Sequence, residues 1–353
     1  MKPTRLLSAT LVIAALAVTA CGSDDNDSSP AASTGSSSTA APKATQTVSV
    51  ALGWTPNTDY TGVYVADKLG YYAKAGIKLK IIPYASTAPE TLISAGRADL
   101  GFSYQAGVAY ARAAGKDVVG VFSPNAKNTY AIGVKADNDK VSSPKDLSGK
   151  TYAGFGTPDE GPELSYVIKQ DGGSGKFKNV TLNTSAYDAV YNGKADFTIP
   201  VTTWEGIEAK LVGKPLKYFN FEDYGFPTQY ASLLASSDKW LQGNADLAKA
   251  FLAATQKGYE YSAAHPDEGA QILVDLNKSA LKNTQLVKES EELLAKEYRK
   301  DDQGRIGYQD ETVWDNYGGF LYKNGLLVDG KGKKLTAEPD WTTYYTNDYL
   351  PAS

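Results

Sequence analysis

Few residues in this 353-residue sequence are of the types that perform catalysis. The chain has one cysteine, Cys21, and one histidine, His265, which excludes a His- or Cys-rich metal site and any disulfide within the chain. It has no G-x-S-x-G nucleophile elbow and no G-x-x-x-x-G-K-[ST] phosphate loop. We therefore predict no catalytic residue, no metal ligand and no cofactor. Only a Glu or Asp pair acting as acid and base would leave hydrolysis open.

Aromatic residues indicate recognition of a small molecule instead. Tyrosine occurs 24 times, and rings with a polar tip are favoured in pockets. Trp54 lies beside Pro56 and Asn57 in a loop after a predicted strand, a context that favours a cavity wall over a core position. Tyr104 and Gln105 also follow a strand end, where they either contact a ligand or fill the edge of a cleft. We expect three other tryptophans to be packing residues: Trp240, Trp314 and Trp341.

The elements that carry these residues predict an α/β fold. Strand patterns at 48–52 and 77–83 flank a helical stretch at about 62–75, which makes a β-loop-α-β unit. The alternation continues through AIGVKAD, so we assign residues 46–136 to the first part of lobe one. It restarts with TYAGFG and NVTLN, and we assign 137–230 to lobe two.

The rest of the chain, 231–353, is predicted to return to lobe one. It has one strand pattern, YASLLAS, followed by amphipathic helices at 244–262, 266–275 and 284–298. Two α/β lobes joined by crossing strands place a ligand between them, at the carboxyl ends of the strands. Closure about such a hinge is an established domain movement.

Two segments suggest that one lobe arose by duplication of the other. ISAGRADLGF at 93–102 and VYNGKADFTI at 190–199 both have the pattern of helix, Gly, basic residue, Ala-Asp and strand. Gly96 and Gly193 suit the left-handed conformation that ends a helix.

The amino-terminal segment predicts export and anchoring. Lys2 and Arg5 precede an apolar run at 6–18, and the following V-T-A-C resembles the bacterial lipobox. We therefore predict a lipoprotein signal peptide at 1–20, a lipid anchor on Cys21 and a disordered Ser-rich tether at 21–45. The expected location is the extracytoplasmic face of the cell membrane. A net charge of −4 without a basic cluster argues against nucleic acid as a partner.

Six segments together resemble a known family: LGWTPNTDYTGVYVADKLGYYAKAGI, SYQAGVAYARA, GFGTPDEGPEL, TTWEGIEAK, DYGFPTQYASLLAS and YTNDYL. They are similar to proteins that bind hydroxymethylpyrimidine or formylaminopyrimidine, the pyrimidine precursors of thiamin, for ABC importers. The resemblance covers nearly all of the chain after the tether. It implies a two-lobed type II periplasmic-binding-protein fold with a ligand cleft between the lobes. It also implies an ABC permease and its ATPase as partners, and a monomer.

The resemblance also implies site residues. In the family, the loop WTPNTNHTG supplies an aromatic wall and an Asn that meets the pyrimidine, which correspond here to Trp54, Asn57 and Tyr60. Tyr60 stands where the family has His. This change counts against the chemistry of the related fungal pyrimidine synthase, which uses a His in this loop.

Lobe two is expected to contribute further ligand contacts from Phe155, Glu160, Trp204 and Glu205. An aminopyrimidine has ring-nitrogen acceptors and an amine donor, so aromatic rings, a carboxylate and an amide complement it. For the acids there are structural alternatives. Glu160 could simply favour a helix N-terminus, and Glu205 could complete a capping box with Thr202.

Tyr224 and Tyr230 complete the predicted set of ligand contacts, together with Tyr104 and Gln105. Sulfonate or nitrate would need cationic or clustered N–H groups, and the only arginine in these segments is Arg112, on a predicted helix. Anionic ligands are therefore ranked below pyrimidines and riboflavin.

The function predicted from the sequence is capture of a pyrimidine precursor of thiamin by lobe closure. Riboflavin or another small organic molecule is the alternative ligand. An extracytoplasmic enzyme related to the pyrimidine synthases, or a ligand-sensing lipoprotein, is the alternative of another class.

Overall fold

The structure is a computed structural model that describes residues 45–351. The signal peptide, the anchor on Cys21 and nearly all of the tether fall outside the described residues, so these stay predictions. The described residues group into one compact unit by their contacts. Within the described range, no helix is long and apolar enough to cross a membrane.

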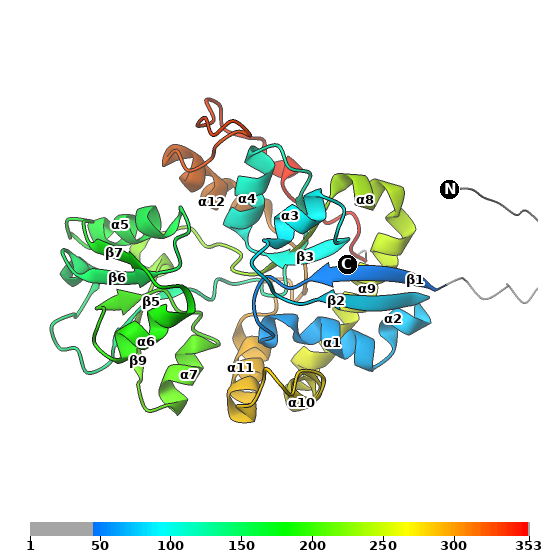
Figure 1. The fold of residues 1–353 in the computed structure, drawn as a ribbon, viewed down its shortest axis with the longest axis horizontal. Helices are drawn as coiled ribbons and strands as arrows, with labels where there is room; N and C mark the ends of the chain where they lie inside the picture. Colours follow the sequence, from blue (N-terminus) through cyan, green and yellow to red (C-terminus); the bar gives the residue numbers. More distant parts are fainter. Residues whose placement is uncertain (1–44, 352–353) are drawn as a thin grey trace, which may run out of the picture. The chain divides into compact units, whose positions relative to one another are not determined.

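The first of two five-stranded sheets forms the centre of lobe one. Its strand order is β2 (Ile77–Ile82), β1 (Gln46–Ala51), β3 (Leu100–Ser103), β10 (Leu233–Ser236) and β4 (Val119–Phe122). β1 runs parallel to β2 and β3, whereas β10 is antiparallel to both of its neighbours. The blue and cyan strands of this sheet are labelled in Figure 1.

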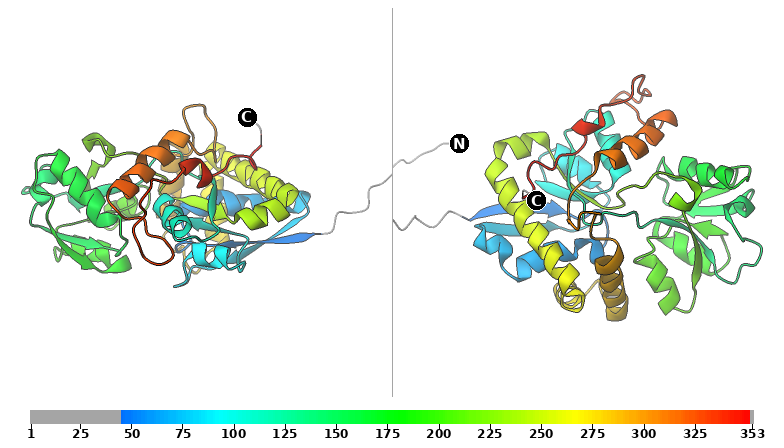
Figure 2. Two further views of the ribbon diagram at one scale, coloured as in Figure 1. Left: turned by 90° about the horizontal axis from the view of Figure 1, so that it is seen from above. Right: turned by 180° about the vertical axis from the view of Figure 1, so that it is seen from behind.

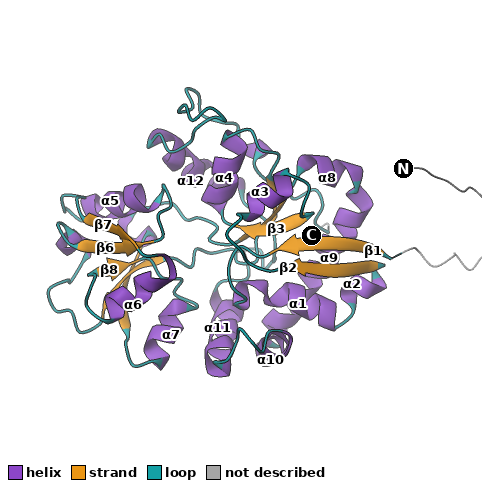
Figure 3. Ribbon diagram, viewed as in Figure 1, coloured by secondary structure: helices purple, strands orange, loops and turns teal. Residues whose placement is uncertain are grey.

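The second sheet forms the centre of lobe two. Its order is β7 (Lys178–Thr181), β6 (Thr151–Gly154), β8 (Phe197–Thr198), β5 (Ala131–Lys135) and β9 (Leu216–Asn220). β6 is parallel to β7 and β8, and β5 is antiparallel to β8 and β9. Both sheets therefore have one topology, in which the antiparallel strand is the one that enters from the other lobe. Figure 3 shows the strands of the two sheets in orange, with β1 to β3 in one lobe and β6 to β8 in the other.

The predicted duplication is visible in side-chain contacts as well. Gly96 and Gly193 end their helices with φ of 65° and 69°. The Asp of each Ala-Asp pair then makes an equivalent hydrogen bond. Asp99 accepts one from the Ser49 amide at 2.7 Å, and Asp196 accepts one from the Thr151 amide at 2.8 Å. Each carboxylate thus ties the start of the strand that follows it, β3 or β8, to the parallel neighbour of that strand, β1 or β6.

One predicted lobe boundary is corrected by the structure. The sequence placed AIGVKAD and residues up to 136 in lobe one, but β5 (Ala131–Lys135) lies in the second sheet. The first crossing is therefore at 123–130, between β4 and β5, and the return crossing at 221–232, between β9 and β10. The pattern of an apolar strand does not contain the long-range pairing that decides which sheet it joins.

The long helices of the return segment agree with prediction. The structure has α9 (Ala245–Ala264), α10 (Pro266–Leu276) and α11 (Thr284–Glu297). In the view from behind in Figure 2, the yellow helix α9 crosses the strands of the first sheet. It packs closely on α1 (Thr61–Lys68), since a Cβ on Gly258 would lie 2.0 Å from the Gly62 carbonyl oxygen.

The single helix predicted at 62–75 is instead two, α1 and α2 (Tyr71–Lys74), because Gly70 between them is left-handed, with φ of 74°. The remaining helices are α3 (Pro89–Ser94), α4 (Gln105–Ala113), α5 (Glu160–Gln170), α6 (Ala186–Tyr191), α7 (Glu205–Leu211), α8 (Asp238–Gly243) and α12 (Glu311–Lys323). Trp314 and Trp341 are buried and Trp240 packs half-buried against the core of lobe one, so all three pack as predicted.

Candidate ligand-binding site

A cavity of about 720 Å³ is lined by loops from both lobes. In lobe one these loops follow β1, β2 and β3, and in lobe two they follow β6 and β8. All five loops leave the carboxyl ends of parallel strands, where α/β sheets bind ligands. The sequence predicted this location.

Eight of the eleven predicted contact residues line the cavity: Trp54, Asn57, Tyr60, Tyr104, Phe155, Glu160, Trp204 and Glu205. Lobe one supplies the first four and lobe two the last four. Their contact with a ligand stays a prediction.

The other three predicted residues lie outside the cavity lining. Gln105 accepts a hydrogen bond from the Tyr230 amide at 3.0 Å and donates one to the Val313 carbonyl at 3.2 Å. The Tyr230 hydroxyl accepts from the Asp310 amide at 2.6 Å, and Tyr224 is half-buried in a short helix after β9. Gln105 and Tyr230 therefore join chain segments, a role that local sequence context does not distinguish from ligand contact.

Aromatic rings from the two lobes meet across the cavity. The rings of Trp54 and Phe155 are 6.5 Å apart between centroids, with an interplanar angle of 81°. Tyr84 extends the Trp54 side at 5.3 Å and Tyr187 extends the Phe155 side at 5.5 Å. Such rings offer both faces and edges to a flat ligand.

Asn57 shapes the loop after β1. Its Oδ1 accepts from the Asp59 amide at 2.9 Å and its Nδ2 donates to the Thr55 carbonyl at 3.3 Å, so both ends of the amide are engaged within the loop. Tyr60 is buried, with its ring 4.5 Å from that of Phe102. We therefore expect Asn57 to act on a ligand mainly by holding this loop.

Glu160 holds the corresponding loop of lobe two. Its carboxylate accepts from the amides of Phe155 at 3.0 Å and Thr157 at 3.1 Å, and from the Tyr152 hydroxyl at 3.0 Å. A Cβ on Gly154 would lie 2.3 Å from Glu160 Oε2, so glycine is needed there. This geometry gives Glu160 a structural role in positioning the Phe155 loop, which differs from the helix N-terminus role considered from the sequence.

Glu205 does not form the capping box that was the structural alternative to ligand contact. α7 begins at Glu205, after Trp204, and the Thr202 hydroxyl donates to the Thr129 carbonyl at 3.0 Å instead of capping. Glu205 Oε2 accepts from the Val201 amide at 3.2 Å. Burial raises the pKa of Glu205 to about 8. At neutral pH this carboxyl is therefore largely protonated and can donate a hydrogen bond to a ring nitrogen.

Two further acids at the start of α5 contact residues beyond lobe two. The Tyr110 hydroxyl, on α4, donates to Asp159 at 3.2 Å, and the Tyr317 hydroxyl, on α12, donates to Glu163 at 2.6 Å. Burial raises the pKa of Asp159 to about 6 and that of Glu163 well above its usual range. These contacts tie the start of α5 to lobe one.

Most of the ionisable side chains that line the cavity are acids. The lining residues include one cation, Lys116, and six carboxyl groups: Asp59, Glu90, Asp159, Glu160, Glu163 and Glu205. Such a lining favours a ligand with N–H donors or positive charge over an anion. Among residues 45–351, no three His, Cys, Asp or Glu side chains are grouped to hold a metal ion.

Sequence reasoning missed several lining residues: Asp59, Tyr84, Tyr110, Tyr130, Glu163 and Tyr187. Asp59 had a usable signal, because it lies between two predicted contacts in one loop. Tyr110, Glu163 and Tyr187 lie on helices and had no such signal in the sequence, because their role depends on how the lobes meet.

Comparisons with known proteins show which family the chain is similar to. The chain is 31% identical over 281 residues to the formylaminopyrimidine-binding protein of Halalkalibacterium halodurans, covering 77% of this chain and 84% of that one. It is 26% identical over 237 residues to a 4-amino-5-hydroxymethyl-2-methylpyrimidine phosphate synthase of Legionella pneumophila, covering 64% and 72% of the two chains.

Among solved structures, the chain resembles the periplasmic aliphatic sulphonate binding protein SsuA from Escherichia coli, with a TM-score of 0.61 and 16% identity over 82% of this chain and 92% of that one. This likeness confirms the predicted periplasmic-binding-protein fold. Residues 57–269 match the family model described as NMT1/THI5 like. The chain therefore belongs to the NMT1/THI5-like family.

Proposed function

We propose that this protein is the extracytoplasmic solute-binding component of an ABC import system, and that it captures a pyrimidine precursor of thiamin. The observation that carries the proposal is the cavity lined by aromatic and acidic side chains from both lobes. The similarity of the chain to a formylaminopyrimidine-binding protein supports the choice of ligand.

The residues of the cavity complement an aminopyrimidine. Its flat ring stacks on Trp54 or Phe155, whose rings come from different lobes. The protonated carboxyl of Glu205 donates to a ring nitrogen, and ionised carboxylates accept from the exocyclic amine. A single ligand thereby bridges the two lobes.

Closure of the lobes around the ligand would bend the two crossing segments. The Tyr130 hydroxyl donates to the Ala231 carbonyl at 3.3 Å, which joins the crossings at 123–130 and 221–232 side by side. A short paired connection of this kind suits a hinge. The hydrogen bonds to Asp159 and Glu163 would then hold the lobes together on one side.

Binding without turnover is favoured by the residues at hand. Tyr60 replaces the His of the family loop, and His265 lies at the start of α10, outside the cavity lining. Uptake further rests on the predicted lipid anchor at Cys21 and on a permease and ATPase as partners. Gene neighbours would distinguish uptake from sensing, because a membrane kinase in their place indicates a sensor.

Riboflavin is the second candidate ligand, and cavity size favours it. A volume of about 720 Å³ is within the range of sites for ligands larger than one ring. The acidic lining gives the smaller amine-bearing pyrimidine the better charge match.

A thermal-shift screen tests the proposal. The purified protein would be melted with 4-amino-5-hydroxymethyl-2-methylpyrimidine, thiamin, riboflavin, taurine and nitrate, since a ligand specific to the folded state raises the melting temperature. We expect the pyrimidine to give the largest shift and to be recovered unchanged by chromatography. A shift with riboflavin or an anion alone contradicts the ligand, and consumption of the pyrimidine contradicts the binding-only role.

A further inference from the structure

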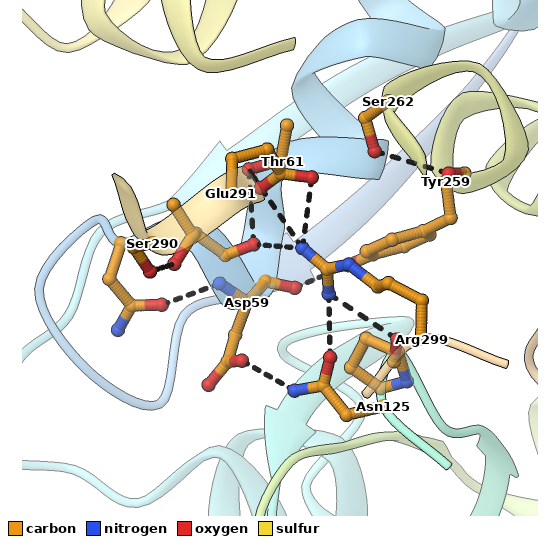
Figure 4. A network of polar contacts seen from close by, with 11 residues as sticks. Asp59, Thr61, Asn125, Tyr259, Ser262, Ser290, Glu291 and Arg299 are labelled. Carbon is orange, nitrogen blue, oxygen red and sulfur yellow. Dashed lines mark hydrogen bonds and ion pairs between the residues drawn. The ribbon is translucent and has the colours of Figure 1, made fainter. Parts of the chain in front are cut away.

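Asp59 is one of the acids in the cavity lining with a carboxylate oxygen to which the described residues donate no hydrogen bond. Asp59 lies in the loop after β1, is half-buried and lines the cavity. Its Oδ1 accepts a hydrogen bond from Asn125 Nδ2 at 2.7 Å. No hydrogen bond or ion pair from residues 45–351 is made to Oδ2, which has no dashed line in Figure 4.

A buried network fixes the position of this carboxylate. Arg299 is fully buried and donates to Asn125 Oδ1 at 2.9 Å, to the Thr58 carbonyl at 2.7 Å and to Glu291. The Tyr259 hydroxyl donates to the Asp59 carbonyl at 2.5 Å (Figure 4). Asp59 is therefore held from its backbone and from one side-chain oxygen, and its carboxylate cannot turn without breaking these contacts.

Arg299 does not neutralise Asp59 by direct contact. Its guanidinium pairs with the carboxylate of Glu291, 3.1 Å away, and reaches Asp59 only through Asn125. Burial raises the pKa of Asp59, and the nearby charge of Arg299 opposes this rise. A half-buried carboxylate with one open oxygen is stabilised by a ligand that brings an N–H donor or a positive charge.

We propose that Asp59 is a specificity-determining residue whose Oδ2 binds an amine or another N–H donor of the ligand from the lobe-one side of the cavity. This inference rests on the proposed function, in that the ligand is taken to bind in this cavity. Glu205 belongs to lobe two, so the ligand contacts an acidic group in each lobe. A ligand with a carbonyl oxygen in place of the amine would face Oδ2 with an acceptor and be rejected.

Calorimetric titration with matched ligands tests this role. The first pair is 4-amino-5-hydroxymethyl-2-methylpyrimidine and its 4-oxo analogue, and the second pair is benzylamine and benzyl alcohol. We expect the native protein to prefer the amine of each pair. Asp59→Asn keeps an acceptor for Asn125 but removes the charge, and should weaken binding of the amine by about tenfold to a hundredfold, the range of a charge-assisted hydrogen bond. Binding of the oxo analogue should change by less than about threefold.

Two variants control for indirect effects. Asp267→Asn removes the same charge from α10, where the side chain is 70% exposed, and should leave the preference unchanged. Asp59→Ala serves as a second variant if Asp59→Asn does not fold, and the ligand comparison on the native protein needs no variant.

The possible outcomes separate the two proposals. Equal loss for both members of a pair would assign Asp59 to loop positioning and overturn the inference, as would an unchanged amine preference in Asp59→Asn. If neither pyrimidine binds but benzylamine does so through Asp59, the pyrimidine proposal fails and the inference stands. If the native protein prefers the amine in neither of the two pairs, the inference is refuted.

Discussion

The Arg299 network predicts a large effect of a single buried substitution. Arg299→Met removes the guanidinium but keeps an unbranched side chain of similar length. The side chains of Arg299 and Glu291 are both 0% exposed. Without Arg299, the Glu291 carboxylate keeps the hydrogen bond that the Thr61 hydroxyl donates to it at 2.7 Å, but it loses its ion pair. Removing one partner of a buried ion pair costs about 3 to 5 kcal/mol of stability, because the remaining charge is unpaired.

Urea unfolding, followed by tryptophan fluorescence and circular dichroism, measures this loss. The melting temperature should also fall by roughly 6 °C or more, at about 2 °C per kcal/mol for a large domain. Arg299→Met/Glu291→Met removes both charges, so it should recover at least half of the lost stability. This double variant should still bind ligand more weakly than the native protein, because Asn125 and the Thr58 carbonyl lose the donor that holds the loop.

Two results would refute this reasoning. A loss below about 1 kcal/mol for Arg299→Met would mean that the network does not stabilise the fold. A double variant less stable than the single one would mean that packing of these side chains, and not the unpaired charge, accounts for the loss.

Three other changes test separate parts of the site. Gly154→Ala should weaken ligand binding, because the added Cβ would clash with the Glu160 carboxylate that holds the Phe155 loop. Gly161→Ala is the control and should leave ligand binding unchanged, since no atom lies within 4 Å of the added Cβ. Equal affinities in titrations of the two variants would contradict this prediction. The pKa of Glu205 is raised from 4.5 to about 8, so the folded state retains a proton that the unfolded state loses, and stability falls as pH rises between these values. The melting temperature of Glu205→Gln, compared with that of the native protein, should therefore rise as the pH goes from 5 to 8. A fall in this difference would refute the raised pKa of Glu205. Trp54→Ala should lower affinity by about tenfold or more through lost stacking, and Trp240→Ala, outside the cavity, should not.

Features of the fold that are encoded locally could be predicted from the sequence. The bounds of α9, α10 and α11 differ from the predicted ones by two residues at most, because each helix repeats apolar residues with a helical period. Gly96 and Gly193 were predicted to be left-handed from their positions after a helix, and both are.

Features that depend on distant pairing could not be predicted in this way. β5 reads as a strand, but only its hydrogen bonds to β8 and β9 assign it to lobe two. The roles of Gln105 and Tyr230 as links between segments likewise depend on partners about a hundred residues or more away.

The most direct test of the central claim is a calorimetric titration of the purified protein with 4-amino-5-hydroxymethyl-2-methylpyrimidine at neutral pH. The cavity between the lobes predicts saturable binding of one molecule per chain, with the compound recovered unchanged. Absence of binding under conditions where riboflavin or an alkanesulfonate binds, or conversion of the compound, would contradict the claim.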